Sequence, residues 1–535
     1  MAHGTAKHHA PVVYFGRGGQ GQCKSRRRYS DDGTLDMTEP LEGAIHPVEE
    51  AYIDFLGRYP SYEETTGLDI LRAVEYSRID QQGQVYLDYT GGSLYGESQL
   101  HNHMELLRSG VFGNPHSANP ASVAMTEHVE RTRRFVLTYF RARPEDYVVV
   151  FTANATGALK LVGESYPFAP GGRCLLTFDN HNSVNGIREF AHARGAEVDY
   201  APLTTPELRL DGPRLEALLA QAHPNHANLL AYPAQSNFSG VRHSLEWVAK
   251  ARSKGWDVLL DAAALVPTGR LDLAAVQPDF VSVSFYKMFG YPTGVGALLI
   301  RRATLGKLKR PWFAGGTVNF VSVQGSAHVL SSSEAGFEDG TLNYLSIPAV
   351  EIGLRYLDSL GVETIGERVR CLTGWLLAEL LALRHGNGRA MVRIYGPITT
   401  QGRGATVALN FYDPQEHLLD YRRVEELAND ERISLRTGCF CNPGSSEMAE
   451  GLTEEDMLAA MDEGPGITLR SFVQLMQKRG GKSAGAIRVS FGLASNFADA
   501  WRFVQFAGRF RDQARLAIGE ATFDIESCRI IRDGS

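Results

Sequence analysis

Cysteine is scarce in this chain, and the scarcity bears on where the protein works. Six cysteines are spread over 535 residues, too few and too scattered for a disulfide framework, which favours a reducing, cytoplasmic compartment. No segment approaches the ~18 uninterrupted apolar residues that a membrane-spanning helix needs. The first residues lack the charged-then-apolar order of a secretory signal. We therefore expect a cytoplasmic protein with no membrane partner.

An excess of positive charge is also lacking. The 54 Lys and Arg residues against 61 Asp and Glu residues give a net charge of −7, whereas proteins that bind nucleic acid with the whole chain are strongly basic. No nucleic-acid partner is expected. With 43% hydrophobic and 21% charged residues, the composition is that of a globular protein, and the length allows two to four structural units.

The chain divides into three parts by pattern. Residues 1–45 show no apolar periodicity and contain the basic run Lys24–Arg28, which predicts a flexible extension and leaves a short nucleic-acid arm open. Residues 46–345 consist of an N-terminal segment followed by apolar runs that alternate with helical spacing, so we expect a large α/β domain there. Residues 346–535 predict a smaller α+β domain.

The expected strands of the large domain are seven short apolar runs, which predict one mostly parallel or mixed sheet. They are Tyr147–Phe151, Cys174–Phe178, Glu197–Tyr200, Asn228–Tyr232, Asp257–Leu260, Phe280–Ser284 and Gly296–Ile300. The elements expected in the smaller domain are helices at Val362–Leu383, Arg422–Ala428 and Phe497–Ala514 and strands at Thr406–Phe411, Ile433–Arg436 and Ala486–Phe491.

Two of the expected strands end in groups of opposite charge. Apolar and polar residues alternate from Phe280 onward, so the strand there is expected to end at Lys287, and Asp261 sits at the carboxyl end of the run Val258–Leu260. Taken alone, Lys287 would be an exposed strand-end lysine, but active-site groups in open α/β sheets gather outside the carboxyl ends of strands. A lysine and a carboxylate that share one crevice are what a pyridoxal phosphate enzyme needs, for the Schiff base and for the protonated pyridine nitrogen.

A phosphate cradle is expected at the segment Thr152–Gly157, which joins a strand to a helix. Small residues at a helix N-terminus leave backbone N–H groups for an anion, and the hydroxyls of Thr156 and Ser284 could complete the cradle. Thr or Asn at such a position is also an ordinary helix cap.

A polar loop in the smaller domain carries two cysteines, Cys439 and Cys441, after Arg436. A zinc site is not expected, because the other four cysteines are scattered. A disulfide between the two would be a tight, strained ring. A nucleophilic thiol on a mobile loop, with Arg436 favouring the thiolate, fits best. Arg488 alternates with apolar residues on a strand, where it is either a surface arginine or a clamp for a carboxylate.

Taken together, these segments resemble the class V, fold-type I pyridoxal phosphate enzymes, and among them the N-terminal cysteine desulfurase domain of molybdenum cofactor sulfurases. The similar segments lie between about residues 85 and 510, in the order of the family. They are Tyr86–Gly92, Phe112–Ser117, Asn180–Val184, Ser236–Gly240, Ser284–Gly294, Phe337–Thr341 and Arg436–Asn442.

The resemblance implies a role for each cofactor-site residue. Lys287 would form the Schiff base, Asp261 would pair with the pyridine nitrogen, and His181 would stack on the ring. The residues implied around the phosphate are Ala155, Thr156, Ser284 and Tyr286, with Thr341 reaching it from the neighbouring subunit of a homodimer.

It also implies the substrate site and the reaction. Asn237 and Arg488 would hold the carboxylate of L-cysteine or a related amino acid, in a substrate site that includes Arg436. Cys441 would take the sulfur as a persulfide, leave alanine, and pass the sulfur to an acceptor protein or small molecule. Cys439 falls where many relatives lack a cysteine, so its role stays open.

Two departures keep other functions open. The chain stops at Ser535 without room for the further C-terminal domain of these sulfurases, and Ala264 stands where bacterial desulfurases usually place a glutamine. The alternatives are a C–S lyase, a selenocysteine lyase or another class V enzyme of specialised metabolism, and a non-catalytic binding protein.

Overall fold

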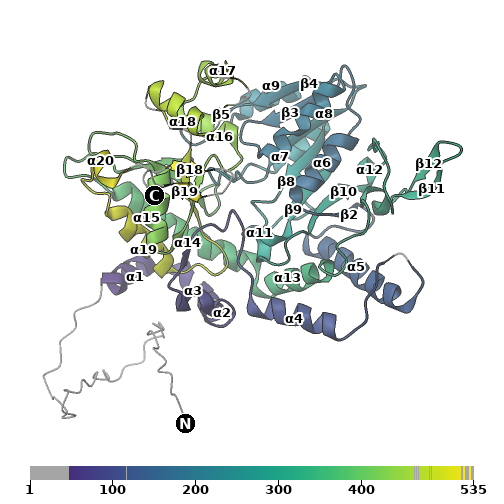
Figure 1. Ribbon diagram of the computed structural model, residues 1–535, viewed down its shortest axis with the longest axis horizontal. Coiled ribbons are helices and arrows are strands. Elements are labelled where there is room, and N and C mark those ends of the chain that lie inside the picture. Colours follow the sequence, from purple (N-terminus) through teal and green to yellow (C-terminus); the bar gives the residue numbers. More distant parts are fainter. Residues whose placement is uncertain are drawn as a thin grey trace, which may run out of the picture.

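The computed structural model describes residues 47–519, except 116, 463, 465–466, 468, 481 and 484, together with 522–524 and 529–531. The expected N-terminal extension and its basic run lie outside the described residues. Figure 1 shows a large α/β unit beside a smaller unit that contains the C-terminal third of the chain. Within the described residues, no helix is both long enough and apolar enough to cross a membrane.

The large unit is built on a seven-stranded mixed sheet, which confirms the predicted fold class. In spatial order the strands are β2 (Tyr147–Thr152), β10 (Gly296–Arg301), β9 (Phe280–Ser284), β8 (Asp257–Asp261), β7 (Asn228–Pro233), β3 (Arg173–Thr177) and β4 (Glu197–Ala201). Strand β10 is antiparallel to both neighbours, and the other pairs are parallel. Each predicted strand lies within one residue of an observed one.

Both faces of this sheet are buried, which explains its continuous apolar runs. Along β2, Val148 and Val150 pack in one core, while Val149 and Phe151 pack in the other. The first face is covered by α6 (Ala155–Ser165) and α8 (Ile187–Ala193). The second is covered by α5 (Pro120–Tyr139), α9 (Gly212–Leu219), α10 (Glu246–Ser253) and α13 (Ile347–Leu360).

The other elements of this unit are α4 (Glu97–Arg108), α7 (Asn182–Asn185), α11 (Phe285–Phe289), α12 (Arg302–Leu305), β5 (Leu203–Thr204), β6 (Arg209–Leu210), η2 (Glu334–Phe337) and the hairpin β11 (Val318–Ser322) and β12 (Ala327–Leu330).

The smaller unit has a four-stranded antiparallel sheet in the order β13 (Val392–Tyr395), β14 (Thr406–Phe411), β17 (Ala486–Ser490) and β16 (Arg436–Gly438). The strand predicted at Ile433–Arg436 is two strands, because Ile433–Ser434 (β15) pairs in parallel with Val85–Tyr86 (β1) instead. The helices of this unit are α14 (Val362–Ala382), α15 (Tyr421–Asp430), α16 (Pro443–Glu450), α17 (Glu454–Asp462), α18 (Leu469–Lys478), α19 (Phe497–Gly508) and α20 (Arg515–Ile518), and its last strands are β18 (Thr522–Asp524) and β19 (Arg529–Ile531).

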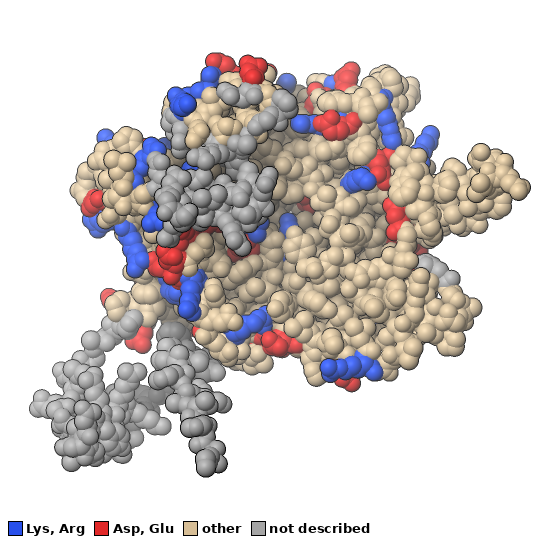
Figure 2. Space-filling model, in the orientation of Figure 1, with Lys and Arg blue, Asp and Glu red and all other residues tan. Residues whose placement is uncertain are grey.

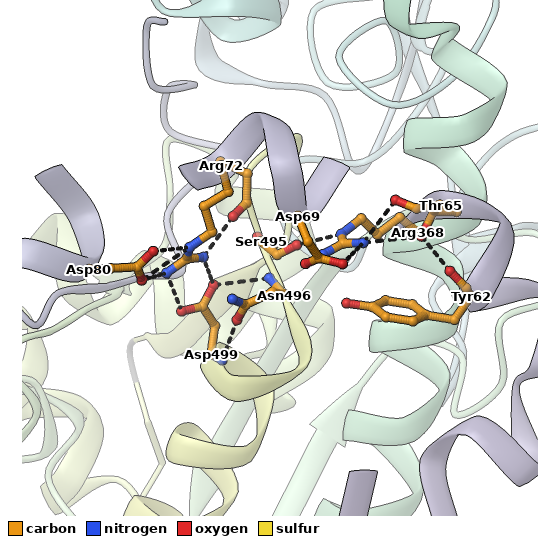
Figure 3. A network of polar contacts seen from close by, with 10 residues as sticks. Tyr62, Thr65, Asp69, Arg72, Asp80, Arg368, Ser495, Asn496 and Asp499 are labelled. Atoms are coloured by element: carbon orange, nitrogen blue, oxygen red, sulfur yellow. Dashed lines mark hydrogen bonds and ion pairs between the residues drawn. The ribbon is translucent and has the colours of Figure 1, made fainter. Parts of the chain in front are cut away.

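The N-terminal helices pack against the smaller unit. They are α1 (Pro47–Arg58), η1 (Pro60–Thr65), α2 (Gly67–Glu75) and α3 (Ser77–Gln81). Arg368 of α14 is buried, pairs with Asp69 of α2 and donates to the carbonyl of Ser495 at 2.7 Å. Arg72 pairs in the same way with Asp80 and Asp499 (Figure 3). Arg368 and Arg72 are therefore both paired with carboxylates, as a buried charge requires.

The hydrophobic cores of the two sheets do not divide the chain at a single residue. Phe55 and Tyr62 of the N-terminal segment pack in the core of the smaller sheet. Ile347 and Leu354 of α13, which follow residue 345, pack in the core of the large sheet. The expected division at residue 345 stays a prediction, and the packing changes core within α14, between Ile365 and Val369.

Candidate active site

Lys287 does not end a strand as expected: β9 stops at Ser284, and Lys287 lies just beyond the sheet in the short helix α11. Its side chain lines a narrow pocket together with Ala263 and Ala264, which follow β8. Burial lowers the pKa of Lys287, and the nearby carboxylate of Asp261 opposes that shift. A lysine with a lowered pKa has more of the neutral amine that attacks a carbonyl carbon.

Asp261 is fixed at the end of β8 by two donors to one oxygen. Ser282 Oγ donates to Asp261 Oδ1 at 3.0 Å, and the N–H of Ala263 donates to the same atom at 3.1 Å. Within the described part of the chain, Oδ2 has no hydrogen-bond partner. That oxygen is the acceptor that a protonated ring nitrogen requires.

His181 belongs to the same charged group. Its Nδ1 accepts a hydrogen bond from the N–H of Ser183 at 3.1 Å, at the start of α7, so the neutral ring carries its proton on Nε2. Burial lowers the pKa of His181; Asp261 opposes the shift, and Lys287 and Arg488 add to it. The uncharged imidazole is therefore favoured, and it offers a flat face.

The expected phosphate cradle is the N-terminus of α6. Asn154 caps the helix by accepting from the N–H of Gly157 at 2.9 Å, while helix geometry leaves the N–H groups of Ala155 and Thr156 without intrahelical partners. Thr156 Oγ1 lies 2.8 Å from Ser183 Oγ. A Cβ at Gly296 would approach the backbone of Asn154 to 2.6 Å, so β10 passes this turn at a distance that only glycine permits.

The other residues implied around the phosphate lie on elements other than α6. Ser284 is buried at the end of β9, and Tyr286 lies in α11, where burial raises its pKa. Thr341 is exposed on the loop between η2 and α13. Its implied contact with a neighbouring subunit stays a prediction.

These residues fit pyridoxal 5′-phosphate. An 11-residue helix presents backbone N–H groups for the phosphate, Asp261 presents an acceptor for the ring nitrogen, and Lys287 presents the amine. Within the described residues, no group of three or more His, Cys, Asp or Glu side chains is arranged for a metal ion.

The Cys441 loop is anchored beside His181 in this structure, and the mobility that the sequence predicts for it stays a prediction. The carbonyl of Cys441 accepts from the N–H of Asn182 at 2.7 Å. Asn237 Nδ2 donates to the carbonyl of Phe440, and Asn442 Nδ2 donates to Asn237 Oδ1, each at 2.8 Å. Phe440 and Cys441 both have a φ of +55°, a conformation that the loop must hold against its strain.

The two thiols of this loop differ in exposure. Cys441 is exposed and Cys439 is half-buried. Burial raises the pKa of the Cys439 thiol, which reduces its thiolate fraction and its reactivity. Of the pair, Cys441 is the better placed nucleophile.

Arg488 and Arg436 both contact Asp88, a residue that the sequence reasoning did not select. Arg488 Nη2 donates to Asp88 Oδ1 at 2.9 Å, and Arg436 Nε and Nη2 donate to Asp88 Oδ2 at 3.0 and 2.7 Å. Arg436 is therefore held by a carboxylate near the thiol loop. Burial lowers the pKa of Arg488, and Asp88 opposes that shift. The one available signal was the position of Asp88 within the segment Tyr86–Gly92.

Asn237 has its side-chain atoms on the loop of Cys441, so its implied contact with the substrate carboxylate stays a prediction. Beneath the loop lies a second pair that the sequence reasoning missed. His243 Nε2 and Asp179 Oδ2 are 2.6 Å apart and buried, and the carbonyl of Asp179 accepts from Asn442 Nδ2. No sequence pattern marked His243.

Comparisons with known proteins show the family and the fold. The family profile described as aminotransferase class-V matches residues 85–503. The molybdenum cofactor sulfurase of Arabidopsis thaliana is 37% identical over 496 residues, which span 85% of this chain and 60% of that protein. This chain thus covers less than two thirds of that relative.

Solved structures show the same fold at low identity. The apo cysteine desulfurase of Thermococcus onnurineus superimposes with a TM-score of 0.67 at 23% identity, over 82% of this chain and 96% of that one. A cystine C–S lyase in complex with its product, cysteine persulfide, superimposes with a TM-score of 0.59 at 17% identity, over 80% of this chain and 98% of that one. The fold is therefore common to desulfurases and lyases.

Proposed function

The chain belongs to the class-V aminotransferase family, and we propose that it is a pyridoxal phosphate-dependent cysteine desulfurase. In the proposed reaction, the Cys441 thiolate attacks the sulfur of L-cysteine, the carbon–sulfur bond breaks, and the carbon takes a proton. L-cysteine and one enzyme thiol thus become L-alanine and one enzyme persulfide, without an external oxidant or reductant.

The bound cofactor supplies an electron sink that makes the α-proton and the sulfur of the substrate labile. The residues of this chain do the rest. Lys287 moves the α-proton, Asp261 holds the ring nitrogen in its protonated state, and Arg488 binds the substrate carboxylate.

The observation that carries the proposal is the anchoring of Cys441. Its carbonyl accepts a hydrogen bond from the N–H of Asn182, the residue after His181. The pKa of His181 responds in turn to both Asp261 and Lys287. An exposed thiol on a loop that is anchored beside His181 is what sulfur transfer needs and what an ordinary aminotransferase reaction does not use.

We further propose a cytoplasmic homodimer that passes its sulfur to an acceptor protein or small molecule. The sparse cysteines support a reducing compartment. The hairpin β11–β12 supports self-association, because it carries exposed Phe320, Val323 and Val329 and its residues 318–330 include no Lys, Arg, Asp or Glu.

The test is to incubate the purified holoenzyme with L-cysteine and to measure alanine and protein-bound persulfide together. Cys441→Ser should lose both by at least about a hundredfold, while the matched variant Cys439→Ser should retain them. Lys287→Ala should lose the absorbance of the bound cofactor. If Cys441→Ser releases sulfur at the full rate, the desulfurase proposal is wrong and a C–S lyase is favoured.

A further inference from the structure

Asp88 occupies the site where two arginines converge. It lies in the turn after β1, and its carboxylate is almost fully buried between Arg436 and Arg488, with one oxygen on each guanidinium. The three side chains come from distant parts of the sequence, so the contact is a feature of the folded site. These three side chains taken alone carry one net positive charge, and Glu425 and Lys287 also act on them electrostatically.

The turn that carries Asp88 is built to keep it there. The N–H groups of Gly91 and Gly92 donate to the carbonyl of Asp88 at 3.0 and 3.1 Å. A Cβ at Gly91 would lie 2.5 Å from Asp88 Oδ2 and 2.8 Å from Arg436 Nη2. A side chain at position 91 would therefore push the Asp88 carboxylate and the Arg436 guanidinium away from the positions they hold here.

Arg488 still has an unused donor. Its Nη1 donates to the carbonyl of Asn237 at 3.1 Å and its Nη2 donates to Asp88, but the buried Nε has no partner among the described residues. The guanidinium carbon lies 4.7 Å from the centre of the Phe440 ring. A buried donor without a partner is rare and indicates a missing acceptor.

We propose that Asp88 sets the charge of the substrate-carboxylate subsite and thereby selects amino acids with one carboxylate and a neutral side chain. The proposal rests on the amino-acid substrate of the proposed function. Arg488 offers its Nε to the substrate carboxylate, and the single net positive charge balances that one negative charge. A second anionic group on the substrate is repelled by the carboxylate of Asp88. Arg436 does not bind that group, because it is already paired with Asp88. Asp88 is thus a positioning residue for specificity.

The test is spectral titration of the holoenzyme with L-alanine and with L-cysteate, which carry neutral and anionic side chains. Asp88→Asn leaves two net positive charges and should shift the ratio of the two dissociation constants about ten- to a hundredfold towards L-cysteate. Asp88→Glu should keep the wild-type ratio. Asp80→Asn, which removes a carboxylate paired with Arg72 outside the site, is the matched control and should also keep it.

A charge-count cycle separates this role from a structural one. Arg436→Gln leaves no net charge and should weaken binding of both ligands, L-cysteate more than L-alanine. The double variant Asp88→Asn with Arg436→Gln has one net positive charge again and should return to within a few-fold of the wild-type ratio. If Asp88→Asn fails to fold, the proposal is tested by the binding ratios of Arg436→Gln and Asp88→Glu for the same two ligands.

The outcomes distinguish this proposal from the desulfurase proposal. A ratio unchanged by Asp88→Asn, a double variant that does not recover, or a wild-type enzyme that binds neither ligand overturns the role of Asp88. The persulfide assay with L-cysteine is read separately. Persulfide without the shift in ratio contradicts only the Asp88 proposal, and the shift without persulfide contradicts only the desulfurase proposal.

Discussion

Asp261 and Lys287 owe their proposed roles to neighbours that act on particular atoms. Ser282 and Ala263 hold one oxygen of Asp261, which orients the other. Burial lowers the pKa of Lys287 while Asp261 limits the shift. The same low dielectric that disfavours an unpaired charge strengthens the attraction between these two groups.

Asp261→Asn is expected to slow alanine formation from L-cysteine by about a hundredfold or more. The asparagine keeps an oxygen for Ser282 and Ala263 but no longer stabilises a protonated ring nitrogen. Cofactor absorbance and thermal stability should be retained. Steady-state kinetics beside an absorbance spectrum would check this, and a rate within a few-fold of wild type would contradict the role assigned to Asp261.

The sequence suffices for some site residues and not for others. Lys287 and Asp261 could be selected because each lies at or just beyond the carboxyl end of an apolar strand, and the resemblance supplied His181 and Cys441. Asp88 could not be predicted, because its partners Arg436 and Arg488 are 348 and 400 residues away. Nothing local to any of the three indicates that they meet.

Strands and helices were predictable where burial repeats along them. The seven strands of the large sheet are buried on both faces and give continuous apolar runs. The strand predicted at Ile433–Arg436 failed as a unit, because Ile433 pairs with Val85 while Arg436 pairs with Arg488. Pairing between distant segments leaves no periodic signal in either one.

Helix α16 links the thiol loop to a half-buried carboxyl group. Asn442 caps the helix, and Glu450 ends it, with Oε1 accepting from Asn410 Nδ2 at 3.0 Å. Burial raises the pKa of Glu450 to about 8, against the smaller opposing effects of Tyr395 and Arg393. The folded protein therefore holds a proton on this group at pH values where the unfolded chain does not.

Glu450→Gln is expected to flatten the dependence of stability on pH. The raised folded pKa means that the stabilising contribution of Glu450 is complete below its unfolded value near 4.5 and is lost as pH rises to about 8. The variant should be more stable than wild type at pH 9 and should lose less stability between pH 5 and pH 9.

Denaturant unfolding at a series of pH values would check that expectation. The matched control is Glu454→Gln, on the exposed first turn of α17, which should leave the pH profile of wild type unchanged. A wild-type protein whose free energy of unfolding is constant between pH 5 and pH 9, or a Glu450→Gln variant with an unaltered slope, would contradict the shift.

The hairpin β11–β12 stands out from the body of the molecule (Figure 1), and in the space-filling view its visible surface has no charged side chain (Figure 2). Its apolar side chains include Val323, which is 94% exposed. Large exposed apolar patches usually mark interaction sites. The loop with Thr341 follows this hairpin, so an interface here would place Thr341 beside a second copy.

Val323→Asp is expected to weaken the proposed homodimer by about tenfold or more, because a charge replaces an apolar contact at the interface. Size-exclusion chromatography with light scattering over a range of protein concentrations would measure it. Ile53→Asp, at an equally apolar but separate exposed site on α1, serves as the control. A monomeric wild type, or a dimer insensitive to Val323→Asp, would contradict the assignment.

The account as a whole depends on sulfur arriving at one particular atom. Mass spectrometry of the holoenzyme after brief exposure to L-cysteine, alkylated without reduction, would locate that sulfur directly. The prediction is one additional sulfur on the peptide that contains Cys441, at Cys441 and not at Cys439, and none in Lys287→Ala. Sulfur on Cys439 alone, or alanine produced with no modified cysteine, would contradict the central claim.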